Sequence, residues 1–369
     1  MNFIVSSKVL KDPQLPAGKS FNTLMLIEED GAKAGTFEIY TSAKQAELAG
    51  ITGDTLTNLQ TIFMQDKAPS FVKIGYVANI STGELTKLAS QTDWYLTLFK
   101  EGQVTEANAG ILSKWFGAEK KIAITTDTDP KALLKTGGIT KALFDAQADH
   151  MFAIYAPKVD IKGDATDDFR FISAVVAGGM ATVNFDDPNS YYALAHLIRN
   201  MKGVRTVALT PDERTNLMGY TINVGYDKTV GIMGNAYISY EGYEFLYEGL
   251  MPNATAVSDV HFIDWLNNRI QQDQAIYFKQ NKVTTYREKD IAGILLNFRK
   301  SLLKGVRSGG LIPEQVKVEN IADLQARITD QMKSNRMLGS IFAEIKCSGQ
   351  ILHVSYETEC VPFNRDLKL

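Results

Sequence analysis

The chain has 369 residues, of which 45% are hydrophobic and 22% are charged, and its formal net charge is −3. This length exceeds that of one ordinary core, so we expect two domains or one core with a large insertion. Because basic and acidic residues are interleaved and the net charge is negative, a nucleic-acid-binding surface is excluded as the main function.

No apolar run approaches the roughly 18 residues that a membrane-spanning helix needs. Residues 1–12 lack the apolar core of a signal peptide, so we expect a soluble protein that stays where it is made. The two cysteines, Cys347 and Cys360, are near the end of the sequence. We predict that both are reduced thiols, and a disulfide between neighbouring strands is the alternative.

Strand and helix patterns alternate through the first half of the chain. Residues 1–20 contain a short strand pattern and then Pro13 and Pro16, which indicates an extended arm followed by a turn-rich linker. Further on, the patterns predict strands at 21–29, 71–77, 94–99, 121–126 and 150–155, and helices at 42–48, 55–65, 81–90, 105–116, 130–135 and 167–180. Such alternation predicts an α/β layer with a partly parallel sheet.

The pattern changes after Asp187. It predicts an amphipathic helix at 191–201, strands at 204–209 and 221–226, a strand pair within 230–250, a shorter helix at 321–337, and strands at 340–347 and 350–361. Capping boxes are predicted at Ser42 with Gln45 and at Thr210 with Glu213.

The longest pattern spans 258–313 and predicts two long helices. Thr285 and Glu288 are predicted to form a capping box at the start of the second helix, and Gly309 and Gly310 are predicted to end it. In each helix, apolar residues recur at three- and four-residue steps, which predicts one apolar face. The residues expected to pack in one core are Phe262, Trp265, Leu266, Leu295, Phe298 and Leu302.

Motifs for catalysis or for cofactor binding are absent from the sequence. No glycine-rich nucleotide loop, no G-x-S-x-G motif and no C-x-x-C motif occurs, and none of the four histidines has a partner at a metal-ligand spacing. Asp167 and Asp168 are explained by the dipole of the helix that they precede. We therefore predict no catalytic residue, no cofactor and no metal. An α/β enzyme or small-molecule-binding protein with an unrecognised site remains the alternative class.

Several short motifs, taken in order, resemble the contractile bacteriophage tail sheath family. They are the strand at 21–29, Tyr40-Thr41-Ser42, 63–69, 72–75, 210–213, Asn235-Ala236-Tyr237, Phe262 to Leu266 with the following helix pair, and 310–313. The stretch 100–187 matches least. The predicted fold is α/β, a mixed sheet core covered by helices, with extended β-arms at both ends.

The predicted division follows from these patterns and the resemblance. The expected parts are an N-terminal arm (1–20), the first part of the core (21–99), a variable or inserted region (100–187), the second part of the core with the helix pair (188–337) and the C-terminal strands (338–369).

The resemblance implies a structural subunit of the virion tail, made in the host cytoplasm. Such subunits assemble as stacked six-membered rings around a tail tube, and their contraction drives the tube into its target. Implied partners are other copies of the chain, the tail tube protein, and baseplate and tail terminator proteins, with no direct contact to nucleic acid or membrane. A tube or baseplate component is the nearest alternative.

Terminal strands are expected to connect neighbouring subunits, because an open strand edge exposes unpaired N–H and C=O groups. The residues expected to make these contacts are Phe3, Ile4, Val5, Leu352, Val354, Tyr356 and Thr358.

Overall fold

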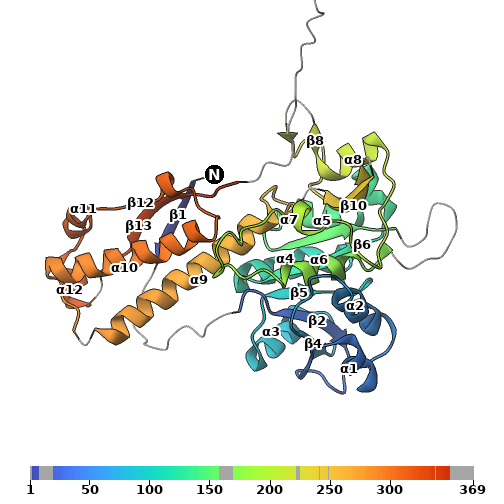
Figure 1. Cartoon of the computed structure of the whole chain (residues 1–369), viewed down its shortest axis with the longest axis horizontal. Helices are drawn as coiled ribbons and strands as arrows, with labels where there is room; N and C mark the ends of the chain where they lie inside the picture. The colour runs from blue at the N-terminus through green and yellow to red at the C-terminus, as the bar shows by residue number, and fades with distance from the viewer. Residues whose placement is uncertain are drawn as a thin grey trace, which may run out of the picture.

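The computed structural model describes residues 2–7, 20–157, 169–221, 225–240, 242–247, 249–281, 283–336 and 338–349. Two lobes are visible in Figure 1. One is an α/β lobe built on a large sheet, and the other is an elongated lobe built on a pair of long helices. No helix among the described residues is long and apolar enough to cross a membrane.

An eight-stranded sheet forms the centre of the α/β lobe. Its strands are β2 (Leu24–Glu29), β3 (Phe37–Tyr40), β4 (Val72–Val77), β5 (Leu96–Leu98), β6 (Ile122–Asp127), β7 (Met151–Tyr155), β10 (Asn235–Tyr240) and β11 (Tyr243–Tyr247). Their order is β11-β10-β7-β6-β5-β2-β4-β3. The six inner strands are parallel, and the two edge strands, β3 and β11, are antiparallel to their neighbours. The predicted α/β class is confirmed.

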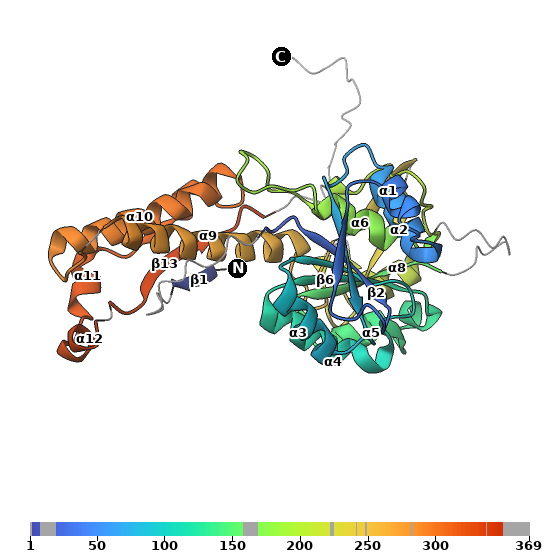
Figure 2. The same cartoon turned by 90° about the horizontal axis from the view of Figure 1, so that it is seen from below.

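Helices cover both faces of this sheet. One face carries α3 (Thr82–Gln91), α4 (Glu106–Glu119) and α5 (Gly138–Asp145), and the other carries α1 (Ala43–Leu48), α2 (Gly53–Phe63), α6 (Ile172–Met180) and α7 (Leu194–Leu197). Figure 2 separates the two layers. Every residue of β6 and β7 is buried, which is the pattern of parallel strands covered on both sides.

Short elements at the edge of this lobe complete it. They are the 3₁₀ helix η1 (Pro130–Leu134), α8 (Pro211–Met218), and the two-residue strands β8 (Tyr220–Thr221) and β9 (Gly225–Tyr226). Thr210 and Glu213 form the predicted capping box at the start of α8, and Gly219 ends that helix in the left-handed conformation.

The elongated lobe contains α9 (Val257–Gln280), α10 (Glu288–Arg307), η3 (Pro313–Gln315), β12 (Lys317–Val318), α11 (Ile321–Ala326), α12 (Asp330–Ser334), β13 (Ile341–Lys346) and β1 (Asn2–Ser7). The helix pair extends away from the α/β lobe in both views, and other helices cover the large sheet. The start of α9 packs against that lobe, where His261 stacks on Tyr95 and Trp265 meets Phe185, while later residues of α9 pack against α10.

The range 100–187 was expected to be a variable or inserted region. It contributes β6 and β7, two inner strands of the large sheet. In this chain the range therefore contributes to the core of the α/β lobe. In the sequence, β6 and β7 are ordinary short strand patterns. In the structure every residue of both strands is buried, which places them inside the sheet.

Several predicted elements differ from the structure. Residues 204–209 form no strand, since only one backbone bond, from Val207 to Tyr237, joins them to the sheet. The stretch 221–226 contributes to a short hairpin, 191–201 contains only the four-residue α7, and 321–337 is divided into α11 and α12 by a new cap at Thr329. The helix expected at 167–180 is α6, which starts at Ile172. The predicted strand at 350–361 lies outside the described residues.

The predicted capping box at Thr285 and Glu288 is wrong. α10 starts after Arg287, and Thr285 donates from both its backbone N–H and its hydroxyl to the Asp290 carboxylate. A carboxylate in the first turn of α10 satisfies the preceding loop and also suits the helix dipole. At α1, the Ser42 hydroxyl accepts from Gln45 N–H as predicted, but the Gln45 side chain bonds Thr41 rather than Ser42.

Candidate assembly interface

A three-stranded sheet joins the two ends of the described chain. Its order is β1-β13-β12, and all its pairs are antiparallel. β1 pairs with β13 over six residues, from Asn2 opposite Lys346 to Ser7 opposite Ile341. The strand of the predicted N-terminal arm thus fills one edge of β13 in its own chain.

β13 alternates between buried and exposed residues along its length. Ile341, Ala343 and Ile345 are buried in the core that the helix pair contributes to. Phe342 lies on the opposite face and is 42% exposed. This period of two is that of a sheet with one covered face, so a one-residue slip of β13 would expose its apolar side.

The second edge of β13 is held by the segment that follows α10. Ile312 N–H donates to the Lys346 carbonyl at 3.1 Å, and Ser348 N–H donates to the Gly310 carbonyl at 3.0 Å. The Glu319 carboxylate accepts from Phe342 N–H at 2.7 Å. The outer strands of this small sheet within the described chain are therefore β1, with six residues, and the two-residue β12.

The helix pair packs beside this sheet through buried apolar residues. Phe262, Leu266, Phe298 and Leu302 are wholly buried, and Trp265 and Leu295 are nearly so. At one end of α10 the backbone approaches α9 closely: an added Cβ at Gly310 would lie 2.5 Å from the Phe262 ring. Glycine is therefore required there for packing, and Gly309 beside it has a φ of +87°, as predicted for a helix stop.

Polar contacts fix the register between the two helices. Lys304 Nζ lies 2.6 Å from an Asp273 carboxylate oxygen, and the Ser301 hydroxyl donates to the same carboxylate at 2.8 Å. Asn297 donates to the Asp273 carbonyl at 3.0 Å. One α9 residue thus binds three residues on successive turns of α10, which opposes sliding of one helix along the other.

A buried polar cluster attaches the start of α9 to the large sheet. The Asp264 carboxylate accepts from the Tyr95 hydroxyl at 2.8 Å and lies 3.0 Å from His150 Nε2. Burial alone would lower the pKa of His150, but the carboxylates of Asp149 and Asp264 outweigh it and raise that pKa. His150, between two carboxylates, therefore joins the start of strand β7 to helix α9.

A second histidine, His261, lies one helical turn before Asp264 on α9. His261 is fully buried, with Nε2 2.8 Å from the Phe21 carbonyl and Nδ1 2.9 Å from the Tyr192 hydroxyl. Its ring stacks on Tyr95 with centroids 5.1 Å apart. Burial lowers the pKa of His261 to about 4, so the ring is neutral at pH 7. All these partners lie within the chain, and the cluster is a joint between lobes.

In the sequence, neither His150 nor His261 has a partner at a metal-ligand spacing. The signal that could have revealed the joint is the spacing of His261 and Asp264, three residues apart on the most apolar face of α9. Their partners, Tyr95 and His150, come from strands far away in the sequence, so only the fold brings them together.

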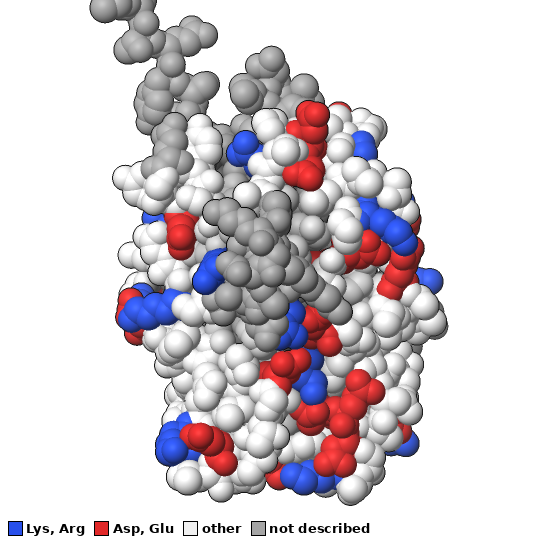
Figure 3. Space-filling view, turned by 90° about the vertical axis from the view of Figure 1, so that its right-hand side faces the viewer, with Lys and Arg blue, Asp and Glu red and all other residues white. Residues whose placement is uncertain are grey.

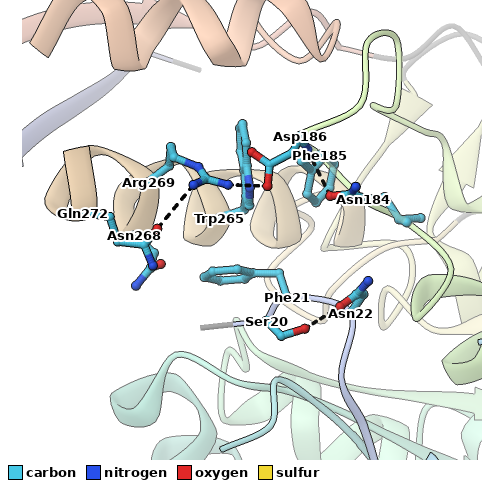
Figure 4. Close-up of a pocket in the computed structure, with 11 residues that line it drawn as sticks. Ser20, Phe21, Asn22, Asn184, Phe185, Asp186, Trp265, Asn268, Arg269 and Gln272 are labelled. Atoms are coloured by element: carbon cyan, nitrogen blue, oxygen red, sulfur yellow. Dashed lines mark hydrogen bonds and ion pairs between the residues drawn. The ribbon is translucent and has the colours of Figure 1, made fainter. Parts of the chain in front are cut away.

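One cavity lies beside this joint, between the start of β2, the loop at 183–186 and α9 (Figure 4). Its volume is about 120 Å³. Arg269 closes one wall by an ion pair with Asp186, and it donates to Gln272 at 3.4 Å. Sites for cofactors usually measure about 300–1,000 Å³, so this cavity is the size of a side chain or a few waters.

The described residues contain no group of three or more His, Cys, Asp or Glu side chains arranged to hold a metal ion. Cys347 is a free thiol among them, and burial raises its pKa to about 12. Such a thiol is a packing residue without nucleophilic character. Cys360 lies outside the described residues, so its pairing stays open.

Of the predicted strand contacts, Phe3, Ile4 and Val5 lie in β1, opposite Ile345, Glu344 and Ala343. The other predicted contacts lie outside the described residues, and they are Leu352, Val354, Tyr356 and Thr358.

The tyrosines of β10 and β11 lie on opposite faces of the large sheet. Tyr237 is buried, whereas Tyr240 and Tyr243 are 54% and 71% exposed.

No family model matches this sequence, and no curated protein matches it. Two solved structures are similar to the structure. A chain from the six-fold symmetrised baseplate of the anti-feeding prophage has a TM-score of 0.57 at 11% identity, over 98% of each chain. A sheath tail protein from Listeria innocua has a TM-score of 0.51 at 11% identity, over 84% of this chain and 90% of that one. The fold is that of a tail sheath protein.

At 11% identity the likeness concerns the fold, and the likeness to the baseplate-structure chain extends over both lobes because it covers 98% of this chain. The match therefore includes the small three-stranded sheet and the helix pair as well as the α/β lobe. Both similar proteins are named for tail or baseplate structures, neither for a catalytic activity.

Proposed function

We propose that this chain is a structural subunit of a contractile tail sheath, which polymerises as stacked rings around a tail tube and contracts to drive the tube forward. The observation that supports this most is the likeness to a baseplate-structure chain along nearly the whole length of both chains. The small sheet provides a means of connection, because β1 is one of its edge strands and pairs with a single neighbour, β13.

In the assembled state, β1 of one subunit would leave its own β13 and pair with β13 of a neighbour. The pairing within one chain seen here is the closed form of the same contact, as in domain swapping, where an identical element is exchanged between copies. Partners would then be other copies of the chain, with the tail tube, baseplate and terminator proteins at the inner surface and ends. The site of action would be the virion tail.

A second candidate is a baseplate component, since one similar chain comes from a baseplate structure. The two candidates differ in assembly form. A sheath subunit forms open-ended tubes of stacked rings, whereas a baseplate component forms a single closed layer.

Negative-stain electron microscopy of the purified chain tests the proposal. Tubes of stacked rings are expected, and a variant lacking residues 1–12 should stay a folded monomer because its connecting strand is gone. Single closed discs would favour the baseplate role. A wild-type chain that remains monomeric at high concentration, or tubes that persist without residues 1–12, would contradict the proposed assembly.

A further inference from the structure

The two lobes differ in charge. Residues 257–346, which include the helix pair, contain 14 Lys and Arg against 10 Asp and Glu, a net charge of +4. The whole chain has 39 against 42, a net charge of −3, so the remaining residues have a net charge of −7. A subunit whose helix-pair region is opposite in net charge to the rest of the chain suits head-to-tail contact between copies.

The positive charge is concentrated on the outer face of α10. Between Asp290 and Glu314 the sequence has no acidic residue, while Arg299, Lys300 and Arg307 are exposed on the helix. Within the described part of the chain, none of these three cations has an ion pair. This stripe is not explained by the helix dipole alone, because Arg299 and Lys300 lie two turns before the last residue of the helix.

Two leucines lie on the same face. Leu296 is 55% exposed and Leu303 is 50% exposed, seven residues apart and therefore on one side of the helix. The residues of this outer face are Leu296, Arg299, Lys300, Leu303 and Arg307, and we call it the α10 outer face. Apolar residues surrounded by exposed charges are typical of a docking surface.

Acidic residues gather at the other lobe, where the parallel strands end. Glu28 and Glu29 end β2, Glu101 follows β5, and Asp54 and Glu106 lie in the first turns of α2 and α4. Lys100 pairs with Glu28, and Arg170 contacts Asp54 and Glu101, so two cations neutralise part of this charge. We call these five carboxylates the acidic crest. Figure 3 views the molecule from this end and shows red side chains gathered with fewer blue ones below the centre.

We propose that the α10 outer face of one subunit docks on the acidic crest of a second copy of this chain. Exposed leucines would be covered by the contact, and cations and carboxylates would be paired across it. Because the two surfaces lie on different lobes, the contact is heterologous and repeats from copy to copy, which generates a ring or a helix. The contact rests on the proposed role as a self-assembling subunit and adds the surfaces that select the neighbour.

Charge reversal tests the contact in the full-length chain. The first variant is Arg299→Glu with Lys300→Glu, and the second is Glu29→Lys with Asp54→Lys; all four residues are exposed. Each is expected to raise the concentration needed for assembly by about tenfold or more, since like charges across an interface cost several kcal/mol. Combining all four changes in one chain should restore assembly, because the surfaces are complementary again.

The control is Lys67→Glu with Lys114→Glu, which changes the net charge by the same amount at two exposed residues of the α/β lobe. Assembly is followed by sedimentation velocity at low and high salt, and each variant is checked for an unchanged melting temperature. A milder variant, Arg299→Gln with Lys300→Gln, removes the two charges without reversing them and is used if charge reversal alters folding. Its expected effect is smaller but in the same direction.

Different results separate this contact from the proposed function. Rings or tubes that form normally in both charge-reversed variants would overturn the contact and leave the sheath role standing. A combined variant that stays monomeric, or a control that loses assembly equally, would also overturn the contact. A salt-sensitive dimer that is lost in each reversal and restored in the combined variant, without rings or tubes, would support the contact and contradict the sheath role. A wild-type chain without any self-association would overturn both.

Discussion

At the scale of single residues, the helix pair depends on a few large side chains. Phe298 is wholly buried and Trp265 is 4% exposed, and both belong to the continuous core that links α9 to α10. We expect Trp265→Ala and Phe298→Ala each to lower the free energy of unfolding by ~3–5 kcal/mol, the range for removing a large buried aromatic side chain. Chemical denaturation measures this value. Leu303→Ala on the exposed face of α10 is the matched control and should change it by less than about 0.5 kcal/mol. An unchanged midpoint for Trp265→Ala would show that the α9 face is not packed.

The buried histidine at the joint predicts a pH dependence. The pKa of His261 falls from 6.5 in the unfolded chain to about 4 in the folded chain because burial disfavours its charged form. Between these values the unfolded chain binds a proton that the folded chain does not, so stability decreases as the pH falls from 6.5 to about 4. The full decrease is about 3 kcal/mol from this residue.

His261→Gln removes this proton uptake, so its stability should fall less than that of the wild type over the same pH range. His150 acts in the opposite sense: its pKa is raised, so its contribution is present below pH 6.5 and is lost as the pH rises through its folded value. Urea denaturation at several pH values measures both trends. Equal pH dependence in the wild type and in His261→Gln would mean that the His261 ring is not buried as described.

At the scale of elements, the sequence predicted what local pattern controls. The inner strands of the sheet, the helices between them and both long helices were found within a few residues of their predicted bounds, because hydrophobic period and caps are local properties. β3 and β12 were missed, since their four and two residues have no readable period. The strand predicted at 204–209 has a suitable pattern but only one backbone bond to the sheet, because β10 is already paired with β7 and β11.

The candidate interface was predicted in part. β13 and the strand character of β1 follow from their sequences, but the pairing of these strands across more than 330 residues does not. Hydrogen bonding between distant segments depends on how the whole chain folds, which local pattern cannot express. The same reason explains why the contacts of Asp264 with Tyr95 and His150 were not foreseen.

Strand exchange is testable at this element scale. Ile4 lies opposite Glu344 in the β1–β13 pair, and directly opposite residues are about 4.5–5.5 Å apart. In a chain with Cys347→Ser and Cys360→Ser, the changes Ile4→Cys and Glu344→Cys should be joined by a short bismaleimide. We expect cross-links between chains in tubes and within the chain in the monomer, as seen on a denaturing gel. Cross-links within single chains in both states would contradict strand exchange.

At the scale of the whole molecule, two kinds of connection differ in stiffness. The lobes are joined by a buried cluster at Asp264, and the two helices are fixed to each other by Asp273 with Lys304 and Ser301. By contrast, β1 lies at an outer edge of the small sheet, where it is bonded to one strand, β13. Motion between subunits should therefore be absorbed at the terminal strand, because breaking the buried joint would leave polar groups without partners.

This difference predicts how a contractile assembly of the chain would move. Two tube forms are expected, a long narrow one and a short wide one, with the placement of α9 on the large sheet the same in both. The energy would come from many small contacts between subunits, since exposed ion pairs are individually worth only ~0–1 kcal/mol and can change partners as subunits rotate. Cryo-electron microscopy of both forms measures this directly. If the hydrogen bond between Asp264 and Tyr95 were broken in one form, or if α9 and α10 had shifted by a turn, the subunit would not move as a rigid body. The joint, rather than the strand, would then be the moving part.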